Sequence, residues 1–343
     1  MTPAGTARRR GATERAPATG GPPLRVEDLV VDLPGPRSTR VRVVDGVSFD
    51  VPRATTVGLI GESGSGKTMT ARAILGLPPE GATLAGRLLW HGEDLLAADP
   101  ERRRAVRGRE IAMIFQDPLA ALNPTQRIGR QIGEIPRRDG LPRAEVRRRV
   151  VALLDRAGVP EPERRMRAHP HELSGGLRQR AMIATALAGE PALLLADEPT
   201  TALDVTVQSR ILRLLAHIQA ADGLAMLLVS HDLRVVSHVA QQVVVMYAGR
   251  VCERGPARDV LRRPAHPYTA ALVRGVPAVR TRTAPADPLP GAPATPSARP
   301  TGCAFHPRCP LARARCRDET PQVRETARGR WSACHFSEEV PGS

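Results

Sequence analysis

Residues 61–68 read GESGSGKT, directly after the apolar run 56–60 (TVGLI) and before a helical pattern over 68–77. The spacing of Gly, four residues and then Gly-Lys-Thr is that of a phosphate-binding loop, and a strand before it and a helix after it are the context that this motif needs. The alternative is a Gly/Ser-rich loop that happens to precede a helix, and the full eight-residue pattern argues against it. The sequence therefore predicts that the chain binds a nucleoside triphosphate.

The residues of this loop have separate expected roles. Glycines allow backbone conformations that are closed to other residues, so that successive N–H groups point at the β-phosphate, and the helix N-terminus adds a partial positive charge. Lys67 is the only lysine among 50 basic residues, and an arginine fork does not wrap a phosphate in the same way. We expect Lys67 to reach the β- and γ-phosphates and the Thr68 hydroxyl to ligate Mg²⁺. The predicted nucleotide-contacting residues of the loop are Gly61, Ser63, Gly64, Ser65, Gly66, Lys67 and Thr68.

Composition limits the class of protein. A chain of 343 residues suits one large or two unequal domains, and its core must be aliphatic because aromatic residues make up only 2%. The formal net charge of +15 suggests nucleic acid, but the arginines are scattered, so we favour solvated faces near an anionic membrane surface. No apolar stretch approaches the roughly 18 to 20 residues that cross a bilayer, and no apolar run of signal-peptide length stands at the N-terminus. We therefore expect a cytosolic protein.

The hydrophobic pattern changes along the chain. Residues 1–23 show no periodicity and are expected to form a disordered arm, whereas alternation from Leu24 to Val51 predicts antiparallel strands. Residues 99–139 look irregular. The short run 193–196 is wholly apolar, as in a parallel strand that is covered on both faces. Other expected strands are 84–90, 226–229 and 243–246, and helical patterns cover 146–154, 177–188 and 211–218. Together they predict an α/β fold with a mainly parallel sheet.

Two acidic residues, Asp197 and Glu198, follow the buried run 193–196. In a domain with a phosphate-binding loop, we expect Asp197 to hold the Mg²⁺ shell and Glu198 to polarise the attacking water. The alternative is a surface acidic pair, and the apolar residues before it argue against that position.

A third motif stands between the first two. Leu173-Ser174-Gly175-Gly176, with Gln179, precedes the acidic pair and opens a helical pattern, where Ser174 can cap and exposed N–H groups can hold an anion. A plain helix cap is the alternative for the tetrapeptide alone. With the three motifs in this order, the chain resembles the ATP-binding subunits of ABC transporters. The resemblance implies a P-loop NTPase fold of the ABC type, with an antiparallel β subdomain and a helical signature subdomain.

Three further segments match this family in order. Gln116 resembles the residue of the glutamine loop, which touches Mg²⁺ and water and senses the membrane partner. Residues 201–204 (TALD), with Asp204, resemble the D-loop, and His231 resembles the switch histidine that contacts the γ-phosphate, although a lone histidine at a strand end is more often structural. The resemblance also implies that Ser174, Gly175 and Gly176 face the nucleotide of another subunit, and that Gln179 and Asp204 belong to the nucleotide-contacting residues as well. Two ATP molecules would then lie between the subunits of a head-to-tail dimer.

One departure from the family concerns adenine. Many relatives have an aromatic residue near the first strands that stacks on the base, whereas residues 34–42 contain none. Arginine side chains can stack on a base instead. The candidates are Arg37, Arg40 and Arg42.

Four cysteines, Cys303, Cys309, Cys316 and Cys334, gather near the C-terminus. In a reducing compartment such a group suggests a metal site before disulfides, although its spacing is irregular and lacks a CxxC pair. Four thiolates suit tetrahedral zinc or an iron–sulfur cluster, and metal-free thiols are the third possibility. Residues 117–124, 266–268 and 302–310 resemble the oligopeptide and dipeptide importer branch of the family, in which such a segment can hold a [4Fe-4S] cluster.

The expected domains are an arm at 1–23, an ABC ATPase domain at 24–263 with a helical subdomain at about 110–185, a Pro-rich linker at 264–300 and a Cys-rich extension at 301–343. The resemblance implies an ATPase that binds MgATP and powers import, of peptides in this branch, from the cytoplasmic face of the membrane. Its expected partners are two transmembrane permease subunits, a second ATPase subunit and, indirectly, an extracytoplasmic solute-binding protein, with no nucleic acid. The alternatives are a soluble ABC-type ATPase acting on nucleic acid or the ribosome, and the ATPase of a drug or antibiotic exporter.

Overall fold

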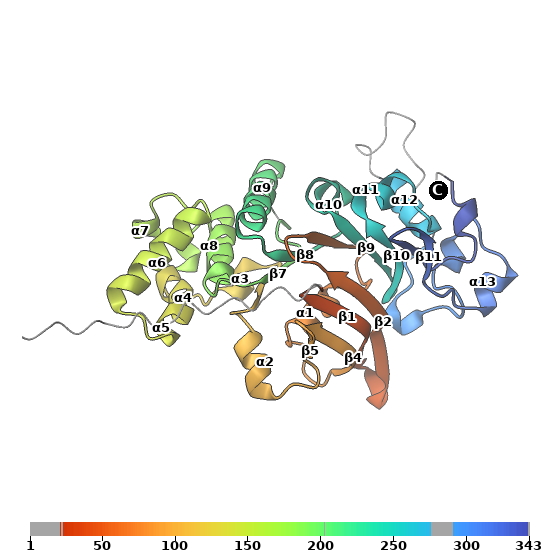
Figure 1. Ribbon diagram of the computed structural model, residues 1–343, viewed down its shortest axis with the longest axis horizontal. Helices are drawn as coiled ribbons and strands as arrows, with labels where there is room; N and C mark the ends of the chain where they lie inside the picture. The colour runs from red at the N-terminus through yellow and green to blue at the C-terminus, as the bar shows by residue number, and fades with distance from the viewer. Residues whose placement is uncertain (1–20, 22, 202, 276–290, 342–343) are drawn as a thin grey trace, which may run out of the picture.

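The computed structural model describes residues 21, 23–201, 203–275 and 291–341 (Figure 1). The predicted disordered arm lies outside the described residues except for residues 21 and 23, and so does 276–290 of the predicted linker. The described residues form two sheets that pack on a common core. The smaller sheet is antiparallel and has the order β2 (Arg40–Val51), β1 (Leu24–Pro34), β4 (Thr83–Trp90) and β5 (Glu93–Asp94).

The smaller sheet confirms the antiparallel strands expected from the alternating pattern. In β1, the side chains of Leu24, Val26, Leu29 and Val31 are buried, and a register shift after Val26 keeps both halves facing the core. The second half of the alternating pattern forms one continuous strand, β2. This sheet packs against the larger one through a shared core that is mainly aliphatic and also contains Phe49 and Trp90.

The larger sheet is parallel at its centre. Strands β3 (Thr56–Ile60), β8 (Ala225–Ser230), β7 (Leu193–Asp197) and β6 (Ile111–Ile114) run parallel to one another, and β9 (Gln242–Tyr247) runs parallel to the other side of β3. Nearly all of their residues are buried, as expected for strands covered on both faces. Strands β10 (Arg250–Pro256), β12 (Arg330–Ser332) and β11 (Arg324–Ala327) continue the sheet in antiparallel order.

Strand β6 corrects one expectation, because residues 99–139 were expected to be irregular. Its four residues are apolar and buried, and they pair with β7. The same segment contains the short helices α2 (Pro100–Val106), α3 (Pro118–Ala121), α4 (Ile128–Ile132) and α5 (Glu134–Arg138). Since β6 belongs to the sheet, the helical subdomain begins at α3 and not at about residue 110.

The helical subdomain, yellow and green in Figure 1, extends from one end of the sheet. Helix α8 (Gly175–Leu187) contacts α3, α4 and α6 (Arg143–Arg156), and α7 (Pro162–Arg165) packs on α6. The helix after the phosphate-binding loop, α1 (Lys67–Ile74), ends three residues before the expected Leu77. After the helical subdomain, the chain forms α9 (Val205–Asp222), α10 (Leu233–Val239) and α11 (Ala257–Arg262).

The beginning of the predicted linker is part of the fold. Residues 267–274 form α12 (Pro267–Arg274), in which Tyr268 and Val273 are buried, and the backbone N–H of Tyr268 donates to Nδ1 of His266 at 3.0 Å. The linker assignment at 264–275 was therefore wrong, because the proline-rich composition begins only after this helix.

The Cys-rich extension does not stand apart from the main domain. Its strands β11 and β12 complete the larger sheet, and it also contains α13 (Ala314–Asp318). The ring of Phe305 lies 5.3 Å from the rings of both Tyr247 on β9 and Tyr268 on α12. The C-terminal extension therefore shares a core with the larger sheet.

This shared core predicts that Phe305→Ala destabilises the whole protein. Loss of a buried phenylalanine should lower the free energy of unfolding by about 3–5 kcal/mol, and the extension should unfold together with the sheet. Urea unfolding followed by circular dichroism measures the change. Val323→Ala, at a side chain that is 42% exposed, is the control and should change stability by less than about 0.5 kcal/mol. A separate early transition of the extension would contradict the shared core.

Candidate nucleotide-binding site

The predicted motifs meet at one edge of the larger sheet. Because β3, β8, β7 and β6 are parallel, their carboxyl ends lie on the same side. The segments that follow these ends are the loop 61–66, His231, Glu198 and Gln116. Four motifs that are far apart in the sequence are thus brought together.

The phosphate-binding loop is fixed by close backbone packing. Gly61 has φ 154°, and a Cβ there would lie 2.2 Å from the carbonyl oxygen of Met246. Gly66, the N-cap of α1, has φ 99°, and a Cβ there would lie 2.8 Å from the carbonyl oxygen of Val43. Only glycine suits these two positions, whereas Ser63 and Gly64 are exposed at the tip of the loop.

Lys67 lies across its own loop. Its Nζ donates to the carbonyl oxygens of Gly61 at 2.8 Å and Glu62 at 2.9 Å, and to Oγ of Ser65 at 3.3 Å. Burial lowers the pKa of Lys67, and nearby carboxylates, first that of Glu198, oppose this effect. The ammonium is therefore held at the loop, where phosphate oxygens could replace the carbonyl acceptors.

Two of the three predicted magnesium ligands are in contact, whereas the third, Gln116, lies on Glu198. The hydroxyl of Thr68 donates to Oδ1 of Asp197 at 3.1 Å, and burial raises the pKa of Asp197. Among the described residues, no group of three or more His, Cys, Asp or Glu side chains could hold a metal ion. One hydroxyl and one carboxylate nevertheless fit Mg²⁺, which usually takes few protein ligands and completes its shell with phosphate oxygens and water.

Glu198 is the centre of a polar network. The Gln116 side-chain amide donates to Oε2 of Glu198 at 3.2 Å, and Nδ1 of His231 lies 3.0 Å from Oε1. The Thr201 hydroxyl also donates to Oε2, at 2.9 Å, a contact that the sequence motif did not predict. Glu198 itself has φ 44°, a strained conformation for a residue with a side chain. The site thus holds this carboxylate in one place.

The signature motif is on the surface. Ser174 is the N-cap residue of α8, and both Ser174 and Gly175 are exposed, while Gly176 is half-buried. The expected cap by the Ser174 side chain is wrong, since among the described residues its hydroxyl makes no hydrogen bond to the helix. The exposed hydroxyl and backbone are consistent with a ligand that comes from outside this subunit.

The two other predicted nucleotide contacts, Gln179 and Asp204, have hydrogen-bond partners within this subunit. Gln179 is buried, and its amide donates to the carbonyl oxygen of Pro199 at 2.6 Å, so it joins α8 to the loop after Glu198. This position does not fit the nucleotide contact that was predicted for Gln179. The Asp204 carboxylate accepts from the backbone N–H of Val207 at 2.9 Å and caps α9, whereas Ala202 of the same motif lies outside the described residues.

The candidate adenine contacts are partly engaged elsewhere. Arg42 pairs with Asp32 at 3.0 Å, and Arg40 donates to the carbonyl oxygen of Gly81 at 2.7 Å. The side chain of Arg37 lies outside the described residues. Stacking by Arg42 would therefore require it to leave its carboxylate partner.

The four C-terminal cysteines surround one small cavity of about 10 Å³ and are free thiols. Burial raises the pKa of Cys309 to about 11 and that of Cys334 to about 12, so both are protonated at neutral pH. In the described part of the chain, no three such ligands are arranged to hold a metal ion. As placed, these side chains do not form a ready-made metal site, but four thiols around one cavity are the donor set that zinc or an iron–sulfur cluster takes.

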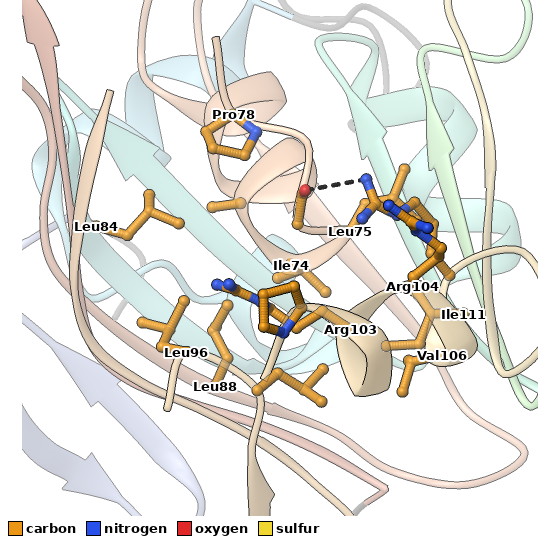
Figure 2. A pocket seen from close by; sticks show the side chains of 15 residues that line it. Ile74, Leu75, Pro78, Leu84, Leu88, Leu96, Arg103, Arg104, Val106 and Ile111 are labelled. Carbon is orange, nitrogen blue, oxygen red and sulfur yellow. Dashed lines mark hydrogen bonds between the residues drawn. The ribbon is translucent and has the colours of Figure 1, made fainter. Parts of the chain in front are cut away.

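A pocket of about 310 Å³ lies apart from these motifs (Figure 2). It is lined by apolar side chains of α1, β4 and α2, together with Arg103, Arg104 and Arg107, and it includes none of the predicted site residues. The Arg107 guanidinium donates to the carbonyl oxygen of Gly76 at 3.2 Å at its edge. This pocket is therefore not part of the candidate nucleotide site.

Comparison with known proteins agrees with this geometry. Residues 44–201 match the family model described as ABC transporter, and residues 252–316 match that of the oligopeptide/dipeptide transporter C-terminal region. The chain is 44% identical over 315 residues to the dipeptide transport ATP-binding protein DppD of Escherichia coli, covering 91% of this chain and 96% of that protein. The chain belongs to the ATP-binding subunits of peptide ABC transporters.

Other relatives lead to the same family. The probable peptide ABC transporter ATP-binding protein y4tR of Sinorhizobium fredii is 44% identical over 92% of this chain and 96% of its own length. The solved structure of cbiO1 from Clostridium perfringens aligns with TM-score 0.60 and 28% identity over 70% of this chain and 90% of that one. The dimeric bacterial ABC transporter cassette MJ0796 aligns with TM-score 0.61 and 25% identity, covering 68% and 99% of the two chains. This ABC ATPase subunit has, among its described residues, no helix that combines the length and apolar character needed to cross a membrane.

The position of Lys67 predicts that Lys67→Ala weakens the binding of MgATP or abolishes its turnover. Removal of the ammonium takes away the expected phosphate contact, so we expect at least about a hundredfold loss of kcat/KM. Lys67→Arg should not restore activity, because the guanidinium has a different shape. Steady-state ATP hydrolysis measures turnover, and binding of a fluorescent ATP analogue measures affinity. Unchanged values for the alanine variant would remove Lys67 from the site.

Proposed function

We propose that this ATPase hydrolyses MgATP to drive the import of di- or oligopeptides. The observation that carries the proposal is the convergence of the phosphate-binding loop, the Thr68–Asp197 pair and the Glu198 network at one edge of the sheet. The peptide specificity of the complex is supported by the match of residues 252–316 and by the names of the relatives.

The side chains supply positioning and charge rather than a covalent intermediate. Backbone N–H groups of the loop 61–68 and the ammonium of Lys67 would hold the phosphates, and Thr68, Asp197 and Gln116 would hold Mg²⁺. Glu198 orients the attacking water, and His231 stabilises the γ-phosphate. The contacts of Gln116, Thr201 and His231 with one carboxylate support this role for Glu198.

We further propose that the active unit is a head-to-tail dimer of ATPase subunits, identical or related. Ser174, Gly175 and Gly176 would contact the γ-phosphate of ATP that is held by the other subunit. Their exposure at the start of α8 supports this arrangement, because Ser174 and Gly175 are open to a neighbouring subunit. The solved cassette MJ0796, to which this chain is similar, is itself dimeric.

The other partners follow from the same relatives. The subunit would attach to two transmembrane permease subunits at the cytoplasmic face of the cell membrane, with a solute-binding protein on the opposite side and no nucleic acid. This proposal rests on the peptide transport named for the E. coli and S. fredii proteins.

A tagged pull-down from detergent-solubilised native membranes tests the proposed function. We expect two multi-span permeases and an extracytoplasmic binding protein, identified by mass spectrometry, and the ligand of that binding protein should be a peptide. The same pull-down with the tag alone is the control. Recovery of nucleic acid or ribosomal proteins without a permease would contradict the transport function.

We propose that the four C-terminal cysteines hold a [4Fe-4S] cluster or, as the alternative, zinc. The support is that four free thiols surround one cavity, although their side chains must move to become ligands. Protein purified without oxygen should contain iron and acid-labile sulfide, or one zinc, and a Cys303→Ser/Cys316→Ser variant should lose it. Cys252→Ser, at the fifth cysteine, is the control. Elemental analysis that finds neither metal would contradict the proposal.

A further inference from the structure

Glu62 is the only acidic residue of the phosphate-binding loop GESGSGKT. The loop receives a polyanion, and a carboxylate beside bound phosphates raises the free energy of the complex by charge repulsion. A negative charge at this place therefore needs a compensating positive charge. The loop itself provides only Lys67, which the phosphates require.

The compensating charge comes from the C-terminal extension. Nη1 of Arg308 lies 2.7 Å from Oε2 of Glu62, and Nη2 lies 3.1 Å from Oε1, so that the guanidinium and the carboxylate form two parallel hydrogen bonds. The Arg308 side chain is 4% exposed and that of Glu62 is 25% exposed. A bidentate pair of this kind, in which the guanidinium is shielded from water, is stronger and more directional than a surface ion pair.

Aromatic residues hold the guanidinium in this position. The central carbon of the Arg308 guanidinium lies 5.8 Å from the ring of Tyr247 and 5.9 Å from the ring of Phe305. Both rings belong to the core that the extension shares with the larger sheet. Arg308 is therefore placed by packing and not only by its charge.

A second contact holds the backbone of the same loop residue. The N–H of Glu62 donates to the hydroxyl oxygen of Tyr268 on α12 at 2.8 Å. The region after residue 252 thus contacts Glu62 through both its side chain and its backbone, although Arg308 is 246 residues away in sequence. Neither Arg308 nor Tyr268 belongs to the ATP motifs.

We propose that Arg308 is a positioning residue of the ATP site, which neutralises Glu62 and, together with Tyr268, holds the phosphate-binding loop ready for the triphosphate. This inference rests on the proposed function, because it concerns the same nucleotide site. It assigns the C-terminal extension a direct effect on ATP affinity. Any change that moves the extension would then change nucleotide binding through Arg308.

Charge neutralisation can be separated from simple anchoring by removing each charge in turn. Arg308→Gln leaves Glu62 uncompensated, and we expect about tenfold weaker binding of Mg²⁺ with a fluorescent ATP analogue. Glu62→Gln should bind at least as tightly as the wild type. The double variant should return to within about threefold of wild-type affinity, since the repulsion is then gone.

Two further variants keep the test interpretable. Arg315→Gln breaks an exposed ion pair with Glu319 in the same extension and should not change affinity. Arg308→Lys keeps the positive charge without the fork and should bind within about threefold of wild type, which provides a second result should Arg308→Gln fail to fold. The melting temperature of each variant reports on folding independently of affinity.

The outcomes separate this inference from the proposed function. If the wild type binds the analogue and Arg308→Gln binds equally well, the inference alone is wrong. If the double variant binds as weakly as Arg308→Gln, Arg308 anchors the loop without neutralising it, and the proposal is overturned. If the wild type binds no nucleotide, the proposed function itself fails.

Discussion

The parallel pairing of β3, β8, β7 and β6 is the constraint on which the site depends. It places the ends of four strands at one edge, so that a loop, an acidic pair, a glutamine and a histidine from distant parts of the sequence come within hydrogen-bond reach. The buried aliphatic residues of these strands provide the stability that this arrangement needs. The polar contacts at the edge then determine what the fold can do.

The two halves of the site are held in different ways. The phosphate-binding loop is constrained by its backbone, because Gly61 and Gly66 lie too close to neighbouring carbonyl groups for any side chain. Glu198 is constrained by its side-chain partners despite a strained backbone. Rigid placement before the nucleotide arrives reduces the reorganisation that hydrolysis would otherwise require.

Much of the ATP site could be predicted from the sequence, because each ATP motif is a short continuous stretch that contains its own functional residues. The contacts of Thr68 with Asp197 and of Gln116 with Glu198 agree with the motif order. Strand β6 was missed because a four-residue apolar run has no visible period and is recognised only by its pairing with β7.

The contact of Arg308 with Glu62 joins residues that are 246 positions apart in the chain, and one sequence carries no local signal for it. Helix α12 and Gln179 show the same limit. A buried tyrosine and a histidine cap support a helix just before the proline-rich stretch, and the Gln179 amide points to Pro199 within its own subunit.

A structure of the Glu198→Gln variant determined with MgATP is the most direct test of this account. We predict intact ATP with its phosphates on the loop 61–68, Mg²⁺ between Thr68 and Asp197, and Ser174 of a second subunit at the γ-phosphate. ATP bound at another surface, or a loop 61–68 without phosphate contacts, would contradict it.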